Sequence, residues 1–210
     1  MIDYKTFMVS PFAQNCRVFF NTDTKECAVF DPGDSAKEIY EAITNIGFSL
    51  KSILITHMHL DHVGGVGLLQ QLSGAKVLGS SIADEVIKRS LDKQALMFSL
   101  PKALPFETEY LEDGQVIEPI TNLKFKVLTT PGHTPGGVCY YSKEQKLVIS
   151  GDTLFNQSIG RTDFEFGDYD AIIDSIKNKL FTLDKDTTVL CGHGPNTNIA
   201  SEIENNPYVV

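Results

Sequence analysis

The most constraining feature of the sequence is the heptapeptide Thr56-His57-Met58-His59-Leu60-Asp61-His62, which places three imidazoles and a carboxylate close together. It continues the short apolar run 52–56, which predicts a strand buried on both faces. Alternate side chains of an extended segment share a face, so the first two histidines are expected to point the same way. If the aspartate and the third histidine begin a helix, they point in another direction. The heptapeptide therefore predicts a functional loop at the end of a buried strand.

The other two histidines lie in comparable surroundings. His133 and His193 each follow an apolar run that predicts a strand, and each has a glycine beside it. Asp152 lies in a third such place, after the predicted strand 146–149 and directly after Gly151. Loops at strand ends are where functional side chains gather, and a buried carboxylate is costly unless it is paired or binds a cation. A lone histidine is most often structural, but here all five histidines occupy such positions.

These side chains are typical metal ligands. Nitrogen and oxygen donors without cysteine favour Zn, with Fe and Mn as alternatives. Seven candidates exceed the four ligands of a structural zinc site, which indicates a catalytic site for two divalent ions. Gly64 and Gly65 would allow close backbone approach beside the ions. The seven candidate ligands are His57, His59, Asp61, His62, His133, Asp152 and His193.

Charge and composition exclude several classes of partner. The formal net charge is −9, and no basic stripe of the kind that binds nucleic acid is present. No run approaches the roughly 20 apolar residues of a membrane span, and the N-terminus lacks the pattern of a signal peptide. The four cysteines form no C-x-x-C pair, so we expect reduced thiols and a cytoplasmic protein. Cys191 is expected to be buried, although it could neighbour the site around His193.

Periodicity predicts strands and helices in both halves of the chain. A helix is expected from Asp34 or Ser35, either of which could cap it, to Gly47, and a second over 171–183. The segment 81–110 is less regular, with a possible helix over 82–91 and a loop marked by two prolines. Helices interleaved with strands predict helices packed on sheets in one domain. The expected strands are 7–9, 16–20, 27–30, 52–56, 123–128, 137–141, 146–149 and 187–190.

At the candidate ligands the chain resembles the metallo-β-lactamase superfamily, through His57-x-His59-x-Asp61-His62 followed by His133, Asp152 and His193. The resemblance implies a mixed α/β (α+β) fold, the αββα four-layer sandwich, over residues 1–210. It also implies that His57, His59 and His133 bind one ion, that Asp61, His62 and His193 bind the other, and that Asp152 bridges both. Asp31 resembles the acid that orients a ligand histidine in this family, and its alternative role is in the turn before Pro32.

Differences from branches of the superfamily narrow the activity that the resemblance implies. The best-known β-lactamases have cysteine where Asp152 stands, and flavodiiron proteins have glutamate at the position of His59. The RNA-processing branch carries a large additional domain. The segments 151–155 and 160–164 are similar to the glyoxalase II group, which hydrolyses S-D-lactoylglutathione, and more closely to its short bacterial type. The chain is expected to lack the helical C-terminal domain of the long form.

Three functions are compatible with this resemblance. The first is thioester hydrolysis by a metal-activated hydroxide, with Asp61 and Asp152 orienting the nucleophile and a small-molecule thioester, either glutathione-derived or similar, as substrate. Arg161 would either hold a substrate carboxylate or form a salt bridge with Asp163. The second is a persulfide dioxygenase with a single iron. The third is a non-catalytic metal-binding module. The sequence leaves the substrate, the metal and the oligomeric state open.

Overall fold

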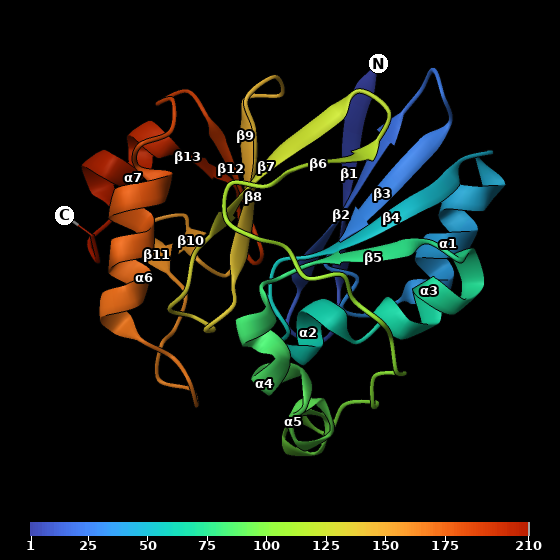
Figure 1. The fold of residues 1–210 in the computed structure, drawn as a ribbon, viewed down its shortest axis with the longest axis horizontal. Helices are drawn as coiled ribbons and strands as arrows, with labels where there is room; N and C mark the ends of the chain where they lie inside the picture. Colours follow the sequence, from blue (N-terminus) through green and yellow to red (C-terminus); the bar gives the residue numbers. More distant parts are fainter. Residues whose placement is uncertain (210) are drawn as a thin grey trace.

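The computed structural model describes residues 1–209 and contains two large β-sheets (Figure 1). The first sheet has the strand order β1-β2-β3-β4-β5, with the first three strands antiparallel and the last three parallel. All of its strands come from the N-terminal part of the chain. They are β1 (Ile2–Val9), β2 (Gln14–Asn21), β3 (Glu26–Phe30), β4 (Ser49–Ile55) and β5 (Lys76–Gly79).

The second sheet comes from the C-terminal part and has the order β13-β12-β9-β8-β7-β6. Its neighbouring strands are antiparallel except β12 and β9, which run parallel. A separate short hairpin consists of β10 (Leu154–Phe155) and β11 (Ser158–Ile159). The strands of the second sheet are β6 (Val116–Ile120), β7 (Leu123–Thr129), β8 (Val138–Ser142), β9 (Leu147–Gly151), β12 (Thr188–Cys191) and β13 (Thr197–Asn198).

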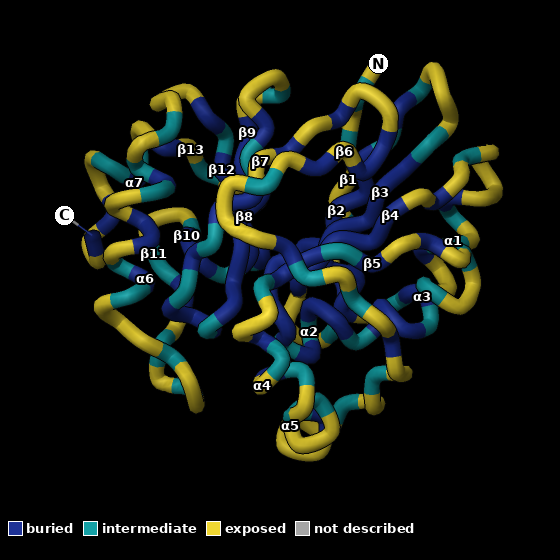
Figure 2. Tube along the Cα trace, in the orientation of Figure 1, coloured by how far each residue is buried: buried dark blue, intermediate teal, exposed yellow. Residues whose placement is uncertain are grey.

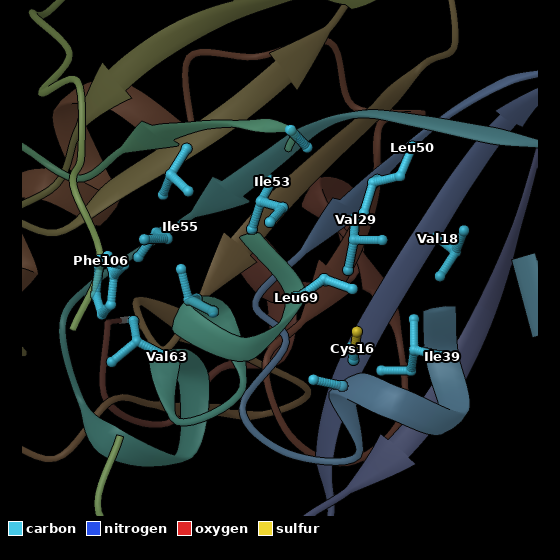
Figure 3. Packing of buried hydrophobic residues seen from close by; sticks show 14 of the residues in the cluster. Cys16, Val18, Val29, Ile39, Leu50, Ile53, Ile55, Val63, Leu69 and Phe106 are labelled. Atoms are coloured by element: carbon cyan, nitrogen blue, oxygen red, sulfur yellow. The ribbon is translucent and has the colours of Figure 1, made fainter. Parts of the chain in front are cut away.

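Helices cover the outer faces of both sheets, as Figure 1 shows, which confirms the predicted αββα arrangement. Helices α1 and α3 pack on the first sheet through one apolar cluster (Figure 3), and α6 and α7 pack on the second through another. The helices are α1 (Ala36–Asn45), α2 (Leu60–Val63), α3 (Val66–Ser73), the 3₁₀ turn η1 (Ile82–Asp84), α4 (Glu85–Lys88), α5 (Leu91–Phe98), α6 (Tyr169–Ser175), the π-helical turn η2 (Ile176–Leu180) and α7 (Ile199–Asn205).

An aromatic core joins the two sheets. Phe19 and Phe30 of the first sheet lie against Phe125 and Tyr140 of the second. The rings pack edge to face, with their centroids 5.3–6.2 Å apart. Figure 2 shows that the strands carry most of the buried residues. The Tyr140 hydroxyl donates a 2.6 Å hydrogen bond to the carbonyl of Ile55, the last residue of β4. The core therefore holds the strand end from which the histidine heptapeptide continues.

The structure corrects several predicted boundaries. Strand β1 begins at Ile2, whereas the prediction began it at residue 7. The prediction was too short because polar and apolar residues alternate in this partly exposed edge strand and give no continuous apolar run. Ser35 occupies the N-cap position of α1, but its side chain makes no capping hydrogen bond. The helix predicted over 82–91 divides into η1 and α4, and α5 follows where none was expected. The helix predicted over 171–183 begins at Tyr169 and ends at Leu180 through its π-helical turn.

Among residues 1–209, no helix is both long enough and apolar enough to cross a lipid bilayer.

Candidate metal centre

The candidate ligands meet because several strands of both sheets end at the same edge of the sandwich. His57 and His59 follow β4, and Asp61 and His62 lie in α2, as predicted (Figure 1). His133 lies in the loop between β7 and β8, whereas Asp152 and His193 lie just beyond β9 and β12. The fold thus brings all seven predicted ligands together.

The first three histidine ligands form a compact set. Ligand atoms of His57, His59 and His133 lie within 4.8 Å of one another. Nδ1 of His59 is only 2.9 Å from Nε2 of His133. This spacing suits nitrogens that share one cation.

A second set lies beside the first. Nε2 of His193 is 3.2 Å from Oδ2 of Asp61 and 3.3 Å from Nε2 of His62. The Asp152 carboxylate lies between the sets, with Oδ1 3.2 Å from Nε2 of His62 and Oδ2 3.6 Å from Nε2 of His133. It therefore reaches His133 of the first set and both histidines of the second.

Hydrogen bonds on the outer side of the rings orient the inner nitrogens. Nδ1 of His133 donates to the carbonyl of Arg161 at 2.7 Å, and Nδ1 of His193 donates to that of Phe12 at 3.0 Å. A carbonyl only accepts, so Nδ1 of each ring carries a proton and Nε2 is the nitrogen that faces the cluster.

His57 is oriented in the same way. The Thr56 hydroxyl donates to Oδ2 of Asp31, so it can accept from Nδ1 of His57 at 3.1 Å. Within residues 1–209, the buried Nε2 of His57 has no hydrogen-bond partner. An inward, unpartnered nitrogen in a ring of such donors is what a metal site requires, so the residues fit divalent cations.

The electrostatics of the cluster favour ligation. Burial, followed by the neighbouring imidazoles, holds the pKa of His57 well below its usual value and lowers the pKa of His59 to about 3. Both rings therefore stay neutral, which is the form that binds metals. Burial opposes a charge on Asp152, but the adjacent His62 outweighs it and holds the pKa of Asp152 below its usual value. The carboxylates thus create a field that attracts positive charge.

A comparison with known protein families agrees with this geometry. The family model described as the metallo-beta-lactamase superfamily matches residues 9–193. The chain belongs to the metallo-beta-lactamase superfamily. It is 38% identical over 203 residues to hydroxyacylglutathione hydrolase GloC of Haemophilus influenzae, covering 96% of this chain and 95% of that protein.

Solved structures of the superfamily have the same architecture. The BLEG-1 B3 metallo-beta-lactamase superposes with a TM-score of 0.90 at 32% identity, covering 99% of each chain. TTHA1623, solved in a di-iron-bound form, superposes with a TM-score of 0.87 at 31% identity, covering 97% of this chain and 99% of that one. These likenesses confirm the predicted family and fold.

Asp31 lies behind the superfamily's histidine motif, as the sequence suggested. Its Oδ2 is 3.1 Å from Nδ1 of His62, and its Oδ1 accepts from the Thr56 amide at 2.7 Å. Asp31 also has a left-handed backbone with φ of 49°, as a turn residue can. The two roles predicted for Asp31, in the turn and beside a ligand histidine, are therefore combined in one residue.

Replacing Asp31 with asparagine is expected to lower metal affinity about 10- to 100-fold, because an amide stabilises the His62 imidazole less than a carboxylate does. Metal affinity measured by competition with a chelator tests this. Asp34→Asn, an exposed change in the same turn, is the matched control and should leave affinity unchanged. Equal affinities of the two variants would show that Asp31 serves the turn alone.

Asp84 is a residue of the site that sequence reasoning missed. Its buried carboxylate accepts hydrogen bonds from the amides of Met58 at 3.0 Å and Gly136 at 2.6 Å, and from the Thr134 hydroxyl at 3.1 Å. It therefore ties the His57–His59 segment to the loop that carries His133. Its position within the helix predicted over 82–91 gave no signal of this role.

Strand β2 supplies a second support that was not predicted. The side chains of Asn15 and Arg17 both donate to the carbonyl of Cys191, and Asn15 also donates to that of Gly194 at 2.9 Å. These bonds fix the loop that carries His193. The Cys191 thiol is buried, and burial raises its pKa to about 12, which agrees with the predicted structural role.

Close approach explains three of the glycine positions. Gly64 and Gly65 allow the predicted close approach of backbones, because they lie against the carbonyls of Gly33 and Pro32; that this approach serves bound ions stays a prediction. At Gly192 an added Cβ would collide with the Asp152 carboxylate. Gly192 therefore leaves room for the side chain of a candidate ligand.

Arg161 lies at the rim of the cavity beside the ligands. Its guanidinium forms two 2.7 Å hydrogen bonds to Asp163, the salt bridge that was one of its two predicted roles. Its other predicted role, binding a substrate carboxylate, stays a prediction.

Proposed function

We propose that the chain is a metal-dependent thioester hydrolase of the glyoxalase II type, acting on S-D-lactoylglutathione or a similar small-molecule thioester. The observation that carries the proposal is the pair of ligand sets connected by Asp152, beside a cavity of about 480 Å³. A hydroxyacylglutathione hydrolase with 38% identity over nearly the whole chain supports it.

Each ligand set would hold one divalent ion. His57, His59 and His133 would hold the first, Asp61, His62 and His193 the second, and Asp152 would contact both. Zinc is the first choice, and the di-iron form of TTHA1623 keeps iron as the main alternative. Divalent cations bound there would lower the pKa of a water molecule and polarise the substrate carbonyl.

The chain's own residues would position the reactants. Asp61 and Asp152 can accept hydrogen bonds from the attacking water and orient it toward the carbonyl carbon. The oxygen of the water adds to the carbonyl carbon, its proton passes to the solvent, and the C–S bond then breaks as the carbonyl re-forms, so that the sulfur leaves as a thiolate and the acyl group as a carboxylate. A thiol has a pKa near ~8.5, so no dedicated acid is needed. A reaction that needs no general acid suits this site, because all five histidines of the chain belong to the ligand sets and none is left to donate a proton.

A β-lactam is the second candidate substrate, because a structure described as a B3 metallo-beta-lactamase superposes on the chain with a TM-score of 0.90. Opening a β-lactam produces an amine, whose nitrogen has to be protonated as it leaves. The residues that line the cavity offer no histidine outside the ligand sets within residues 1–209. The thioester is therefore preferred.

Thiol release from S-D-lactoylglutathione by the zinc-loaded protein tests the proposal, with a β-lactam assayed in parallel. The four cysteines of the chain are buried, so they should contribute little background to a thiol reagent. Asp61→Asn should abolish release, whereas the exposed Asp186→Asn, which only loses an ion pair with Lys146, should retain it.

Other outcomes assign other functions. Oxygen consumption with glutathione persulfide and one iron per chain would favour the persulfide dioxygenase. No turnover of thioester, persulfide or β-lactam by fully metal-loaded protein would favour the non-catalytic module. The predicted cytoplasmic location stays a prediction.

A further inference from the structure

The cavity beside the ligand cluster has unusually apolar walls. Six large side chains from three parts of the chain contribute to them, namely Phe12, Met97, Phe98, Phe155, Phe164 and Phe166. Four of these six are exposed, among them Met97 at 62% and Phe166 at 47%. Large apolar side chains gathered around one hollow mark a binding surface for an apolar group.

The charged side chains of the cavity neutralise one another. Apart from the candidate ligands, those that line it within residues 1–209 are Lys93, Arg161 and Glu165. Lys93 on α5 lies 3.1 Å from Glu165 on the opposite wall. Arg161 is held by both oxygens of Asp163, and its guanidinium stacks on the Phe164 ring at 3.8 Å. A substrate carboxylate could bind Lys93 or Arg161 only if that side chain first separated from its own carboxylate partner.

Two of the three uncharged polar side chains that line the cavity within residues 1–209, Gln94 and Ser90 but not Ser158, are hydrogen-bonded within the protein. Gln94 accepts a hydrogen bond from the Leu60 amide at 2.9 Å and donates one to the Ser90 hydroxyl at 3.0 Å. The Ser90 hydroxyl in turn donates to the carbonyl of Ile87. A polar ligand would therefore lose hydrogen bonds to water and gain few here.

We propose that the cavity selects thioesters whose thiol part is uncharged and apolar, of the size of an aromatic ring, over the charged glutathione peptide. This inference rests on the proposed function and specifies the substrate class of the same site. An apolar group gains burial against the phenylalanines at no electrostatic cost. The glutathione peptide brings two carboxylates into a cavity whose lysine and arginine side chains are both paired with carboxylates, in a chain whose net charge is −9.

The test compares two thioesters with the same acyl group, S-D-lactoylglutathione and the S-D-lactoyl ester of benzyl mercaptan. Their kcat/KM values, each divided by the rate of alkaline hydrolysis, are expected to favour the benzyl ester by about tenfold or more. Equal values, or a preference for the glutathione ester, would overturn the inference and leave the thioesterase intact. If neither ester is cleaved, the proposed function itself fails.

A binding measurement tests the same preference without turnover. Benzyl methyl sulfide and S-methylglutathione lack the reactive carbonyl, and their affinities can be compared by calorimetry. The inference requires the uncharged sulfide to bind about tenfold more tightly. Tighter binding of S-methylglutathione contradicts it.

Removing the neutralising carboxylates should reverse part of the selectivity. Asp163→Asn frees Arg161 and Glu165→Gln frees Lys93, so each change should shift the ratio of kcat/KM about two- to fivefold toward the glutathione ester. Asp92→Asn is the matched control, because Asp92 pairs with Lys102 outside the cavity and should not alter the ratio. If Arg161→Gln selectively reduces cleavage of the glutathione ester, Arg161 binds a substrate carboxylate and the inference is wrong.

Discussion

Replacing Asp152 with alanine is expected to lower kcat/KM for the thioester by about a thousandfold or more, since the loss of a metal site removes several kcal/mol of transition-state stabilisation. The reason lies in its position between the two ligand sets, 3.2 Å from one histidine and 3.6 Å from another. Without that carboxylate, the two ligand sets lose the negatively charged group that lies between them.

Metal analysis separates this explanation from a loss of folding. Metal bound per chain should fall by at least one ion in Asp152→Ala, while circular dichroism stays close to that of the parent protein. Asp113→Ala is the matched control, because Asp113 is an exposed aspartate that pairs with Lys179. A variant that keeps its metal and stays within tenfold of full activity would show that Asp152 does not bridge the site.

Replacing Phe30 with alanine is expected to reduce the free energy of unfolding by about 3–5 kcal/mol. The ring is fully buried between the sheets and touches Phe19, Phe125 and Tyr140 at centroid distances of 5.3–5.4 Å. Its removal leaves a cavity that both sheets would have to close. Such a loss is a large part of the ~5–15 kcal/mol that stabilises a typical domain.

Urea unfolding in the presence of a chelator measures this loss, because bound metal would otherwise add its own stabilisation. Val116→Ala is the control, since Val116 lies on β6 with 64% of its surface exposed and should change stability by less than about 0.5 kcal/mol. Similar losses in both variants would contradict the view that the aromatic core holds the sheets together.

The sequence was a good guide to the candidate ligands because they are marked by rare side chains at strand ends. His57, His59, Asp61 and His62 share one heptapeptide, so local backbone geometry already places them together. His133, Asp152 and His193 were predicted from the apolar runs before them and from the family resemblance. The structure adds the distances, which are short enough for shared cations.

The sequence was a poor guide to the supports of the site. Asp84 is separated from Met58 by 26 positions and from Gly136 by 52, so nothing local indicates that one carboxylate joins their loops. Asn15 and Arg17 likewise read as ordinary strand residues, although they hold a loop more than 170 positions away. Hydrogen bonds of this kind leave no periodic pattern.

By itself, the sequence identified the candidate ligands, because metal-binding side chains at strand ends are a local property, and the order of these ligands along the chain indicated the family and, through that resemblance, the αββα fold. Only the tertiary structure decided what surrounds those ligands. The pairing of Lys93 with Glu165 joins residues 72 positions apart across the cavity. Whether a charge is free or neutralised depends on which side chains the fold brings within a few ångströms, and that distance is not encoded in any short segment.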